Sequence, residues 1–352
     1  MSQRPSGRAV FHFKSKNTGK FSDKIDFFLW RREKTWGRIG AMATLSDISK
    51  KVNVSPAAIS RILNRDPEFV ASKAVRLAVM KAAVEMGYKT PRQRKKGDNT
   101  IEVAVADWHS VPASRRGEFD YSTLIPLSDS KVDYVFSRLE KGSPRLVDAI
   151  IGIGIFSQEE IDELLFSSTN IVFLNNNDDN APFDKMFIDY DTAVLKSIDY
   201  LVEKGCSRIA FISGISEEDG ITIGKRRISA IRDLMKKKGV YDENLVEVGE
   251  LTDESGYRMA EDIMKKNPDA VMLGTQLIEK GVLEYMKSLE HPPLIILRRD
   301  IDLGHEKTDY PVVRMASEQL WRITLMLIYM RSRDPAPPLK VTIEAEFDTT
   351  GL

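Results

Sequence analysis

Basic side chains gather near the N-terminal end of this sequence, in a pattern that suits binding to a polyanion. Residues 42–97 carry twelve Lys and Arg against four Asp and Glu, a net charge of +8. Residues 1–41 carry ten basic against three acidic residues, a net charge of +7, and residues 98–352 carry 30 against 45, a net charge of −15. A basic front joined to an acidic body indicates a polyanion-binding module attached to a domain with another task.

Residue types that would support other chemistry are scattered along the chain. The four histidines show no metal-ligand spacing, so neither a metal nor another cofactor is expected: His12, His109, His291 and His305. The single cysteine, Cys206, cannot form an intrachain disulfide. The sequence has no G-x-S-x-G, no P-loop and no glycine-rich dinucleotide fingerprint. We therefore expect a protein that is not an enzyme.

A helix-turn-helix is predicted for residues 44–64, TLSDISKKVNVSPAAISRILN. Apolar residues recur at helical spacing in its first half, at Leu45, Ile48 and Val52. Asn53 then tolerates the left-handed conformation that ends a helix. Ser55 is suited to cap a second helix, with Pro56 at the first helical position, where a missing N–H costs nothing. Two short helices across a tight turn form this motif.

A third helix and a basic hinge are predicted to follow. The helix should begin after the N-cap Ser72 and end at Gly87, and its apolar stripe consists of Val75, Val79, Ala82, Ala83 and Met86. Residues 89–98, KTPRQRKKGD, contain Pro and Gly and no apolar residue, which is typical of a linker. Its basic side chains are expected to contact DNA phosphates or line the minor groove: Arg92, Arg94, Lys95 and Lys96.

From residue 100 onward, short apolar runs alternate with helical stretches. The runs are typical of buried parallel strands and lie at 101–106, 149–154, 170–174, 208–213, 269–274 and 293–297. One intervening helix begins with a capping box, Ser157 and Glu160. The predicted fold class is therefore a small all-α helix-turn-helix headpiece plus an α/β body of two doubly wound parallel-sheet lobes.

Residues 44–64 resemble the N-terminal signature of the lac repressor / galactose repressor family. The resemblance extends to about residue 350 through weaker pieces: VDAIIGIG (147–154), IDYLVEKGCSRIAFISG (198–214), KRRISAIRDLMKKKG (225–239) and ESGYRMAEDIM (254–264). It implies a body like that of periplasmic sugar-binding proteins, in which a ligand lies between two α/β lobes.

The expected organisation has four segments. Residues 1–41 form a basic extension, expected to be disordered, and residues 42–88 form the headpiece. Residues 89–99 form the basic hinge, and residues 100–352 form the regulatory body. Within the body, we expect an N-lobe of about 100–190 and 313–338 and a C-lobe of about 191–312 and 339–352.

The resemblance also implies which headpiece residues contact DNA. The positions that read base edges in the family match Pro56, Ala57, Ser60 and Arg61. Arg61 is the main candidate because an arginine makes a bidentate contact to guanine, although a phosphate contact or a solvated helix face stays open. The side chains of Pro56 and Ala57 contact bases only through apolar groups, such as a thymine methyl. The matching phosphate-facing positions are Thr44, Ser46, Ser55, Asn64 and Ser72.

The effector pocket of the family matches this chain less closely. The resemblance implies an effector site made from Asp107, Trp108, Arg227, Gln276 and Asp300. Trp108 has the ring to stack on a sugar face, with a place in the core or on the surface as the alternative. Arg298 and Arg299 are foreign to the family pattern, and Gln276 replaces its usual Asp or Asn. A cleft lined by these arginines would suit a phosphorylated sugar or another anion.

Together these features predict a sequence-specific DNA-binding transcription regulator. We expect a cytoplasmic homodimeric repressor of carbohydrate-utilisation genes that binds a near-palindromic double-stranded operator and is controlled by a sugar or sugar phosphate. Three alternatives stay open: the same regulator without small-molecule control, a solute-binding protein with no DNA role, and an enzyme on an α/β scaffold. The basic headpiece argues against the solute-binding protein, and the missing catalytic motifs argue against the enzyme.

Overall fold

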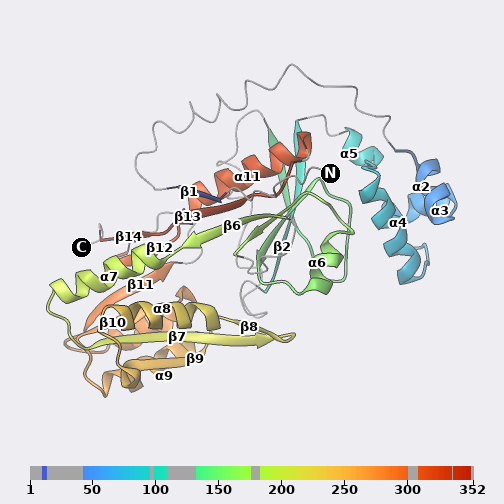
Figure 1. Ribbon diagram of the computed structural model, residues 1–352. Coiled ribbons are helices and arrows are strands. Elements are labelled where there is room, and N and C mark those ends of the chain that lie inside the picture. Colours follow the sequence, from blue (N-terminus) through green and yellow to red (C-terminus); the bar gives the residue numbers. More distant parts are fainter. Residues whose placement is uncertain are drawn as a thin grey trace, which may run out of the picture.

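Three parts follow one another along an elongated molecule: the C-lobe, the N-lobe and the headpiece (Figure 1). The computed structural model of the chain describes residues 10–13, 43–95, 99–109, 132–175, 183–299, 308–334 and 336–349. No helix in these ranges has the length and apolar character that crossing a membrane requires.

The headpiece has the three predicted helices, α2 (Leu45–Val52), α3 (Pro56–Leu63) and α4 (Lys73–Glu85). Their buried sides form one small core, made mainly by Ile48, Ile59, Ile62, Val79, Ala82, Ala83 and Tyr88. The predicted caps are confirmed, because Ser55 and Ser72 cap α3 and α4 through their hydroxyl oxygens. Asn53 ends α2 at a φ of 54°, as its tolerance of the left-handed region predicts.

The segment expected to be a hinge contains a short helix, α5 (Pro91–Lys95). Thr90 and Gln93 hold its start together, since the amide and hydroxyl of Thr90 donate to Gln93 Oε1 over 2.9 and 3.0 Å. The Gln93 amide donates back to the Thr90 hydroxyl over 3.3 Å. This reciprocal arrangement is a capping box, which the high charge of the segment concealed at the sequence level.

The N-lobe is a parallel sheet covered on both faces. Its strands are β2 (Thr100–His109), β3 (Asp133–Arg138), β4 (Ala149–Gly154), β5 (Ile171–Leu174), β6 (Asp184–Asp189), β13 (Lys340–Glu344) and β1 (Val10–Phe13), in the order β1-β13-β6-β5-β4-β2-β3. Alternate residues of β2, β4 and β5 pack on opposite sides, against α11 (Ser317–Arg333) or toward the core that includes α6 (Gln158–Leu164).

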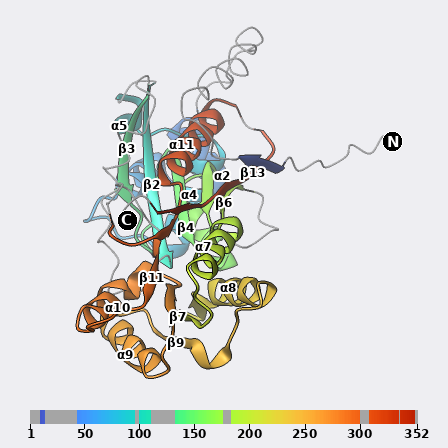
Figure 2. The same ribbon diagram turned by 90° about the vertical axis from the view of Figure 1, so that its left-hand side faces the viewer.

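The C-lobe is also a mainly parallel sheet between helices. Its strands are β7 (Ile209–Glu218), β8 (Ile221–Ile223), β9 (Val246–Glu250), β10 (Ala270–Leu273), β11 (Leu294–Arg299), β12 (Val312–Arg314) and β14 (Glu346–Asp348). Helices α7 (Asp191–Glu203) and α8 (Lys225–Lys237) cover one face, and α9 (Asp253–Met264) and α10 (Glu279–Met286) cover the other (Figure 2). Two short 3-10 helices, η3 (Glu243–Leu245) and η4 (Gln276–Ile278), complete it. The fold class predicted from the sequence is confirmed.

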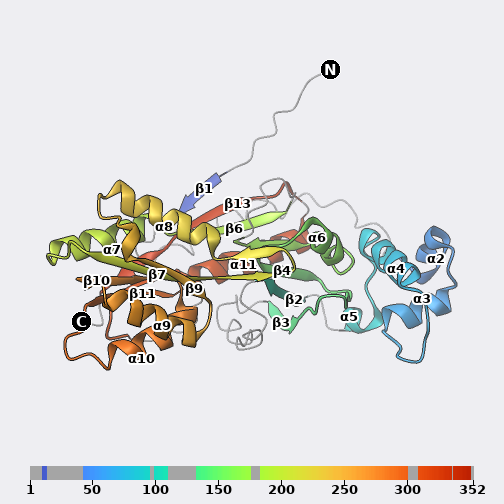
Figure 3. The same cartoon turned by 90° about the horizontal axis from the view of Figure 1, so that it is seen from below.

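The chain crosses between the two lobes at different residues from those expected. The chain passes between the sheets after β6, between β12 and α11, and between β13 and β14, in the part of the molecule that the structure describes (Figure 3). Strand β12 pairs with β11 and so belongs to the C-lobe, whereas β13 pairs with β6 and belongs to the N-lobe. The expected C-lobe segment of about 339–352 was therefore wrong for β13 but right for β14, and β12 ends two residues beyond the expected boundary near residue 312. Short strands of similar composition do not reveal their pairing partner, because tertiary context decides it.

Part of the N-terminal extension is also not disordered as expected. Residues Val10–Phe13 form strand β1, which pairs in parallel with β13 from Val10 against Lys340 to Phe13 against Ile343. Without it, β13 would be an edge strand with unpaired backbone groups. The other residues of the extension lie outside the described residues.

Candidate DNA interface and interlobe cleft

The turn between α2 and α3 is fixed by local hydrogen bonds. Thr44 caps α2, its hydroxyl donating to Asp47 Oδ2 over 2.7 Å while the Asp47 amide donates back over 3.2 Å. The Thr44 hydroxyl and the Thr44 amide, which donates to Asp47 Oδ2 over 2.9 Å, together lower the pKa of Asp47. Ser55 accepts the Ala58 amide over 3.3 Å at the start of α3. The turn itself begins at Asn53, whose amide donates to the Ser49 carbonyl over 2.9 Å, and ends at the cap Ser55, so local bonds define both of its ends.

Helix α3 buries one face and presents the other to solvent. Ile59 and Ile62 point into the headpiece core and are at most 4% exposed. Three of the predicted base-reading residues, Pro56, Ala57 and Arg61, are exposed, and Ser60 is half-buried. The structure therefore brings the predicted residues onto one accessible helix face, as a recognition helix requires.

Arg61 is held by its own headpiece. Its Nε donates to Asp66 Oδ2 over 2.7 Å, and its guanidinium carbon lies 4.9 Å from the centre of the Phe69 ring. The Glu68 amide donates to the other oxygen of Asp66 over 3.0 Å. These bonds, that from Arg61 first, lower the pKa of Asp66. Asp66 and Phe69 thus fix the position of the Arg61 guanidinium. The sequence analysis missed both residues because they lie in the loop after the helix-turn-helix motif.

The same loop is tied down from α4. Arg76 donates from Nη2 to the Phe69 carbonyl over 2.6 Å and from Nε to the Ala71 carbonyl over 3.3 Å. Backbone carbonyls are acceptors for any sequence, so only the geometry identifies Arg76 as a loop anchor.

The predicted phosphate-facing residues lie on the surface of the headpiece and hinge. The exposed ones are Thr44, Ser46, Ser55, Asn64, Ser72, Arg92, Arg94 and Lys95, and Lys96 lies outside the described residues. Arg94 donates from Nε to the Lys89 carbonyl over 2.9 Å and lies 5.5 Å from the Tyr88 ring centre. Its position on α5 is therefore set, whereas the structure places the hydroxyls of Ser55 and Ser72 primarily as caps.

The predicted effector residues lie on both lobes. Asp107 is near the carboxyl end of β2 in the N-lobe, buried, and 3.1 Å from Arg138 Nη2. Arg227 lies in the first turn of α8 and Gln276 begins η4 after β10, both in the C-lobe. Asp300 lies outside the described residues. Carboxyl ends of parallel strands are where ligands bind in open α/β sheets, so the positions of Asp107 after most of β2 and Gln276 after β10 suit a ligand site.

Trp108 does not present its ring to a ligand. The side chain is buried, its Nε1 donates to the Leu139 carbonyl over 2.6 Å, and its ring packs against Phe156 at 5.6 Å. Of the two places considered for Trp108, the structure matches the one in the core. Apolar neighbours from α6 and β5 surround this end of β2, and the indole N–H finds a backbone partner there.

The two arginines foreign to the family pattern have partners within the protein. Arg298 is 4% exposed, and its guanidinium carbon lies 3.5 Å from the centre of the Tyr190 ring, at the passage from β6 to α7. Arg299 forms an ion pair with the largely buried Glu279 at the start of α10. The charge of Arg299 is thus neutralised, and Arg298 is stacked against the passage between lobes.

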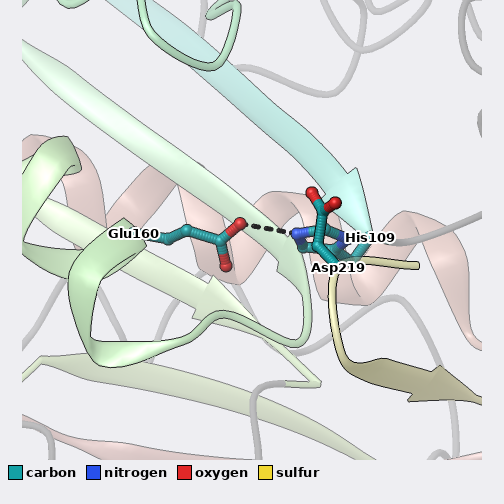
Figure 4. Close-up of side chains that lie close together, drawn as sticks. All are labelled: His109, Glu160 and Asp219. Atoms are coloured by element: carbon teal, nitrogen blue, oxygen red, sulfur yellow. Dashed lines mark hydrogen bonds and ion pairs between the residues drawn. The ribbon is translucent and has the colours of Figure 1, made fainter. Parts of the chain in front are cut away.

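One cluster of charged residues at the junction of the lobes was not predicted. His109, Glu160 and Asp219 place their side-chain ligand atoms within 4.8 Å of one another, a spacing able to hold a metal ion (Figure 4). The ammonium of Lys141 already lies 2.8 Å from Glu160 Oε1 and 2.7 Å from Asp219 Oδ2. The residues come from four distant segments of the chain, so no local spacing reveals them.

The comparisons with known proteins agree with this geometry. Residues 44–91 match the model of the bacterial regulatory proteins of the lacI family. The chain is 26% identical to the transcriptional regulator GalR of Streptococcus thermophilus over 260 residues, 70% of this chain and 78% of that protein. Among solved structures, it resembles the transcriptional regulator CelR in complex with cellobiose, at a TM-score of 0.56 and 18% identity, over 87% of this chain and 98% of that one. It also resembles a lac repressor dimer bound to operator and an anti-inducer, at a TM-score of 0.53 and 15% identity, over 89% of this chain and 100% of that one.

An exposed second helix of a helix-turn-helix, beside a basic hinge and joined to a two-lobed α/β body, is the arrangement of a helix-turn-helix transcription regulator. Residues 44–91 match the lacI family of bacterial regulatory proteins, and the rest of the chain is similar to transcriptional regulators such as GalR.

Proposed function

We propose that this protein is a cytoplasmic, homodimeric repressor of carbohydrate-utilisation genes that binds a near-palindromic operator. The observation that carries this proposal is the pre-positioned Arg61 on the solvent face of α3. A two-fold dimer presents two such helices, which matches two inverted half-sites. The related CelR binds cellobiose, and the related lac repressor binds operator as a dimer.

The body is proposed to bind a sugar or sugar phosphate rather than to catalyse a reaction. Arg227 and Asp107 lie on opposite lobes, and charged groups offset the cost of removing water from sugar hydroxyls. Burial raises the pKa of the Cys206 thiol, which argues against a nucleophilic role for the single cysteine.

Calorimetry of the whole protein with mono- and disaccharides and their phosphates tests the effector. Binding by the wild type that disappears in Arg227→Ala supports the pocket, and Arg226→Ala, one position away on α8, is the matched control. Preference for phosphates would indicate a net positive cleft.

A second candidate is the same operator-binding regulator without small-molecule control. It is favoured by the burial of Trp108, the stacking of Arg298 on Tyr190 and the pairing of Arg299 with Glu279. No heat with any sugar, together with operator binding that none of them changes, identifies this second candidate.

A further inference from the structure

The unpredicted charged cluster connects the two lobes. His109 ends β2 and Glu160 lies in α6, both in the N-lobe, whereas Asp219 lies in the turn between β7 and β8 of the C-lobe (Figure 4). Lys141 lies in the turn after β3 of the N-lobe. An ion pair between Lys141 and Asp219 therefore crosses from one lobe to the other.

Each of the two side chains in this ion pair lies in a turn whose conformation follows from the local sequence. Asp219 and Gly220 both have positive φ, 51° and 77°, between the paired residues Glu218 and Ile221. Such an Asp-Gly turn matches the twist of a hairpin. It places the Asp219 carboxylate at the end of a two-stranded arm that extends from the C-lobe toward α6 (Figure 1).

The N-lobe arm is anchored on α6. The Gly142 amide, at a φ of 78°, donates to Glu163 Oε1 over 2.5 Å, which fixes the turn that carries Lys141. Glu160 accepts the Ser157 amide on Oε2 over 2.9 Å, and its Oε1 lies 2.6 Å from His109 Nε2. The Lys141 ammonium thus has Glu160 as a partner in its own lobe in addition to Asp219 of the C-lobe.

The exposures of the four side chains divide the cluster into a fixed base and a separable arm. His109 and Glu160 are 1% and 7% exposed, whereas Lys141 and Asp219 are 43% and 67% exposed. Water can therefore replace the partner of Asp219 at little cost, but not the partner of Glu160. Separation of the lobes would break the Lys141–Asp219 pair and leave the His109–Glu160–Lys141 group intact.

We propose that the Lys141–Asp219 pair is a clasp that holds the lobes together without a ligand. This inference rests on the proposed function only in assigning the clasp to regulation. A half-exposed ion pair contributes only a small free energy. It therefore shifts the equilibrium between open and closed lobes toward the closed state but does not abolish the open state. The ammonium of Lys141 supplies the cation between the two carboxylates, the place that a metal ion would take.

Distances between spin labels on the two lobes test the clasp in the whole protein without DNA. Labels are attached to cysteines that replace the exposed Glu159 of α6 and Glu250 of β9, in a Cys206→Ala background. Labelled protein is diluted with unlabelled protein, so that only distances within one protomer are measured. The wild type should give one narrow distribution, and Asp219→Asn and Lys141→Met should each give a longer and broader one.

Asp262→Asn is the matched control, because Asp262 is an exposed C-lobe residue that pairs at 2.9 Å with Lys265, the C-cap of its own helix. It should leave the distances unchanged. The double variant of Lys141 and Asp219 should open no further than either single variant, since both remove the same contact. Unchanged distances in Asp219→Asn would overturn the clasp, as would closure that requires added Zn²⁺ and His109. If the wild type gave the narrow distance distribution but bound no operator, the proposed function would be overturned and the clasp would stand.

Discussion

Arg61 is the side chain that we propose as the main reader of a base. With its Nε engaged by Asp66, the two Nη groups remain to face O6 and N7 of guanine. We predict that Arg61→Ala weakens operator binding by about 1–3 kcal/mol and relaxes selectivity at one base pair per half-site. Fluorescence anisotropy with a set of singly substituted operators measures both effects.

Lys95→Ala is the control for this prediction, since Lys95 is an exposed hinge residue expected to contact phosphate. It should weaken all operator variants about equally. Identical selectivity profiles for the two variants would show that Arg61 does not read a base.

Glu160 should make the folding stability of the body depend on pH in the acid range. Burial alone would raise its pKa, but hydrogen bonds from Lys141, His109 and the Ser157 amide outweigh burial and lower the pKa from 4.5 to about 2. A carboxyl with a lowered pKa stabilises the folded state above its unfolded pKa and loses this contribution as pH falls through the folded value. The wild type should therefore lose more stability than Glu160→Gln between pH 4.5 and about 2.

Chemical denaturation at a series of pH values measures this difference. Glu159→Gln, an exposed neighbour on the same helix turn, serves as the control and should follow the wild type. Parallel stability curves for the wild type and Glu160→Gln over this range would refute the ionic role of Glu160.

The residues accessible to sequence reasoning were those in a local pattern. Ser55, Pro56 and Arg61 lie within one contiguous motif, so their exposure on α3 follows from helical spacing. The partners Asp66 and Phe69 lie beyond the motif, and the role of Trp108 depends on neighbours far along the chain. Local patterns thus predict which side a residue faces, and not what it contacts.

At the scale of elements, the hinge helix α5 depends on its capping box. Replacing a capping Ser or Thr by Ala typically costs ~1 kcal/mol of helix stability. We predict that Thr90→Ala frays α5 and weakens operator binding several-fold, because Arg92, Arg94 and Lys95 lose their common scaffold. Operator titrations of the whole protein measure the loss.

Thr252→Ala provides the comparison, because Thr252 caps α9 in the C-lobe through a 3.1 Å bond from the Ser255 amide. It should lower stability by a similar amount and leave operator affinity unchanged. Equal operator affinities for Thr90→Ala and the wild type would mean that α5 is not needed for binding.

Caps and turns could be read from the sequence more surely than strand pairing. Ser55, Ser72 and Ser157 were each predicted as caps and each accepts the expected amide. The capping boxes act over four residues, whereas β12 and β13 choose partners more than ten residues away in sequence. The lobe boundaries at these strands were therefore misassigned, although the number of lobes was predicted.

At the scale of the whole molecule, the uneven charge should make DNA binding strongly salt-dependent. The 42–97 segment has a net charge of +8 in a chain whose overall charge is zero. Neutralised phosphates release counterions, so log affinity should fall linearly with log salt, by ~100-fold or more between 50 and 200 mM. A flat profile would show that the hinge does not contact phosphates.

The central claim is that the headpiece reads a two-part DNA sequence. Selection from a random pool of DNA duplexes by the whole wild-type protein tests it most directly, with Arg61→Ala selected in parallel. We predict enrichment of one near-palindromic sequence with two inverted half-sites, in which Arg61→Ala loses preference at one base pair of each half. A pool that shows no enriched sequence, or one selected equally well by Arg61→Ala, would contradict the account.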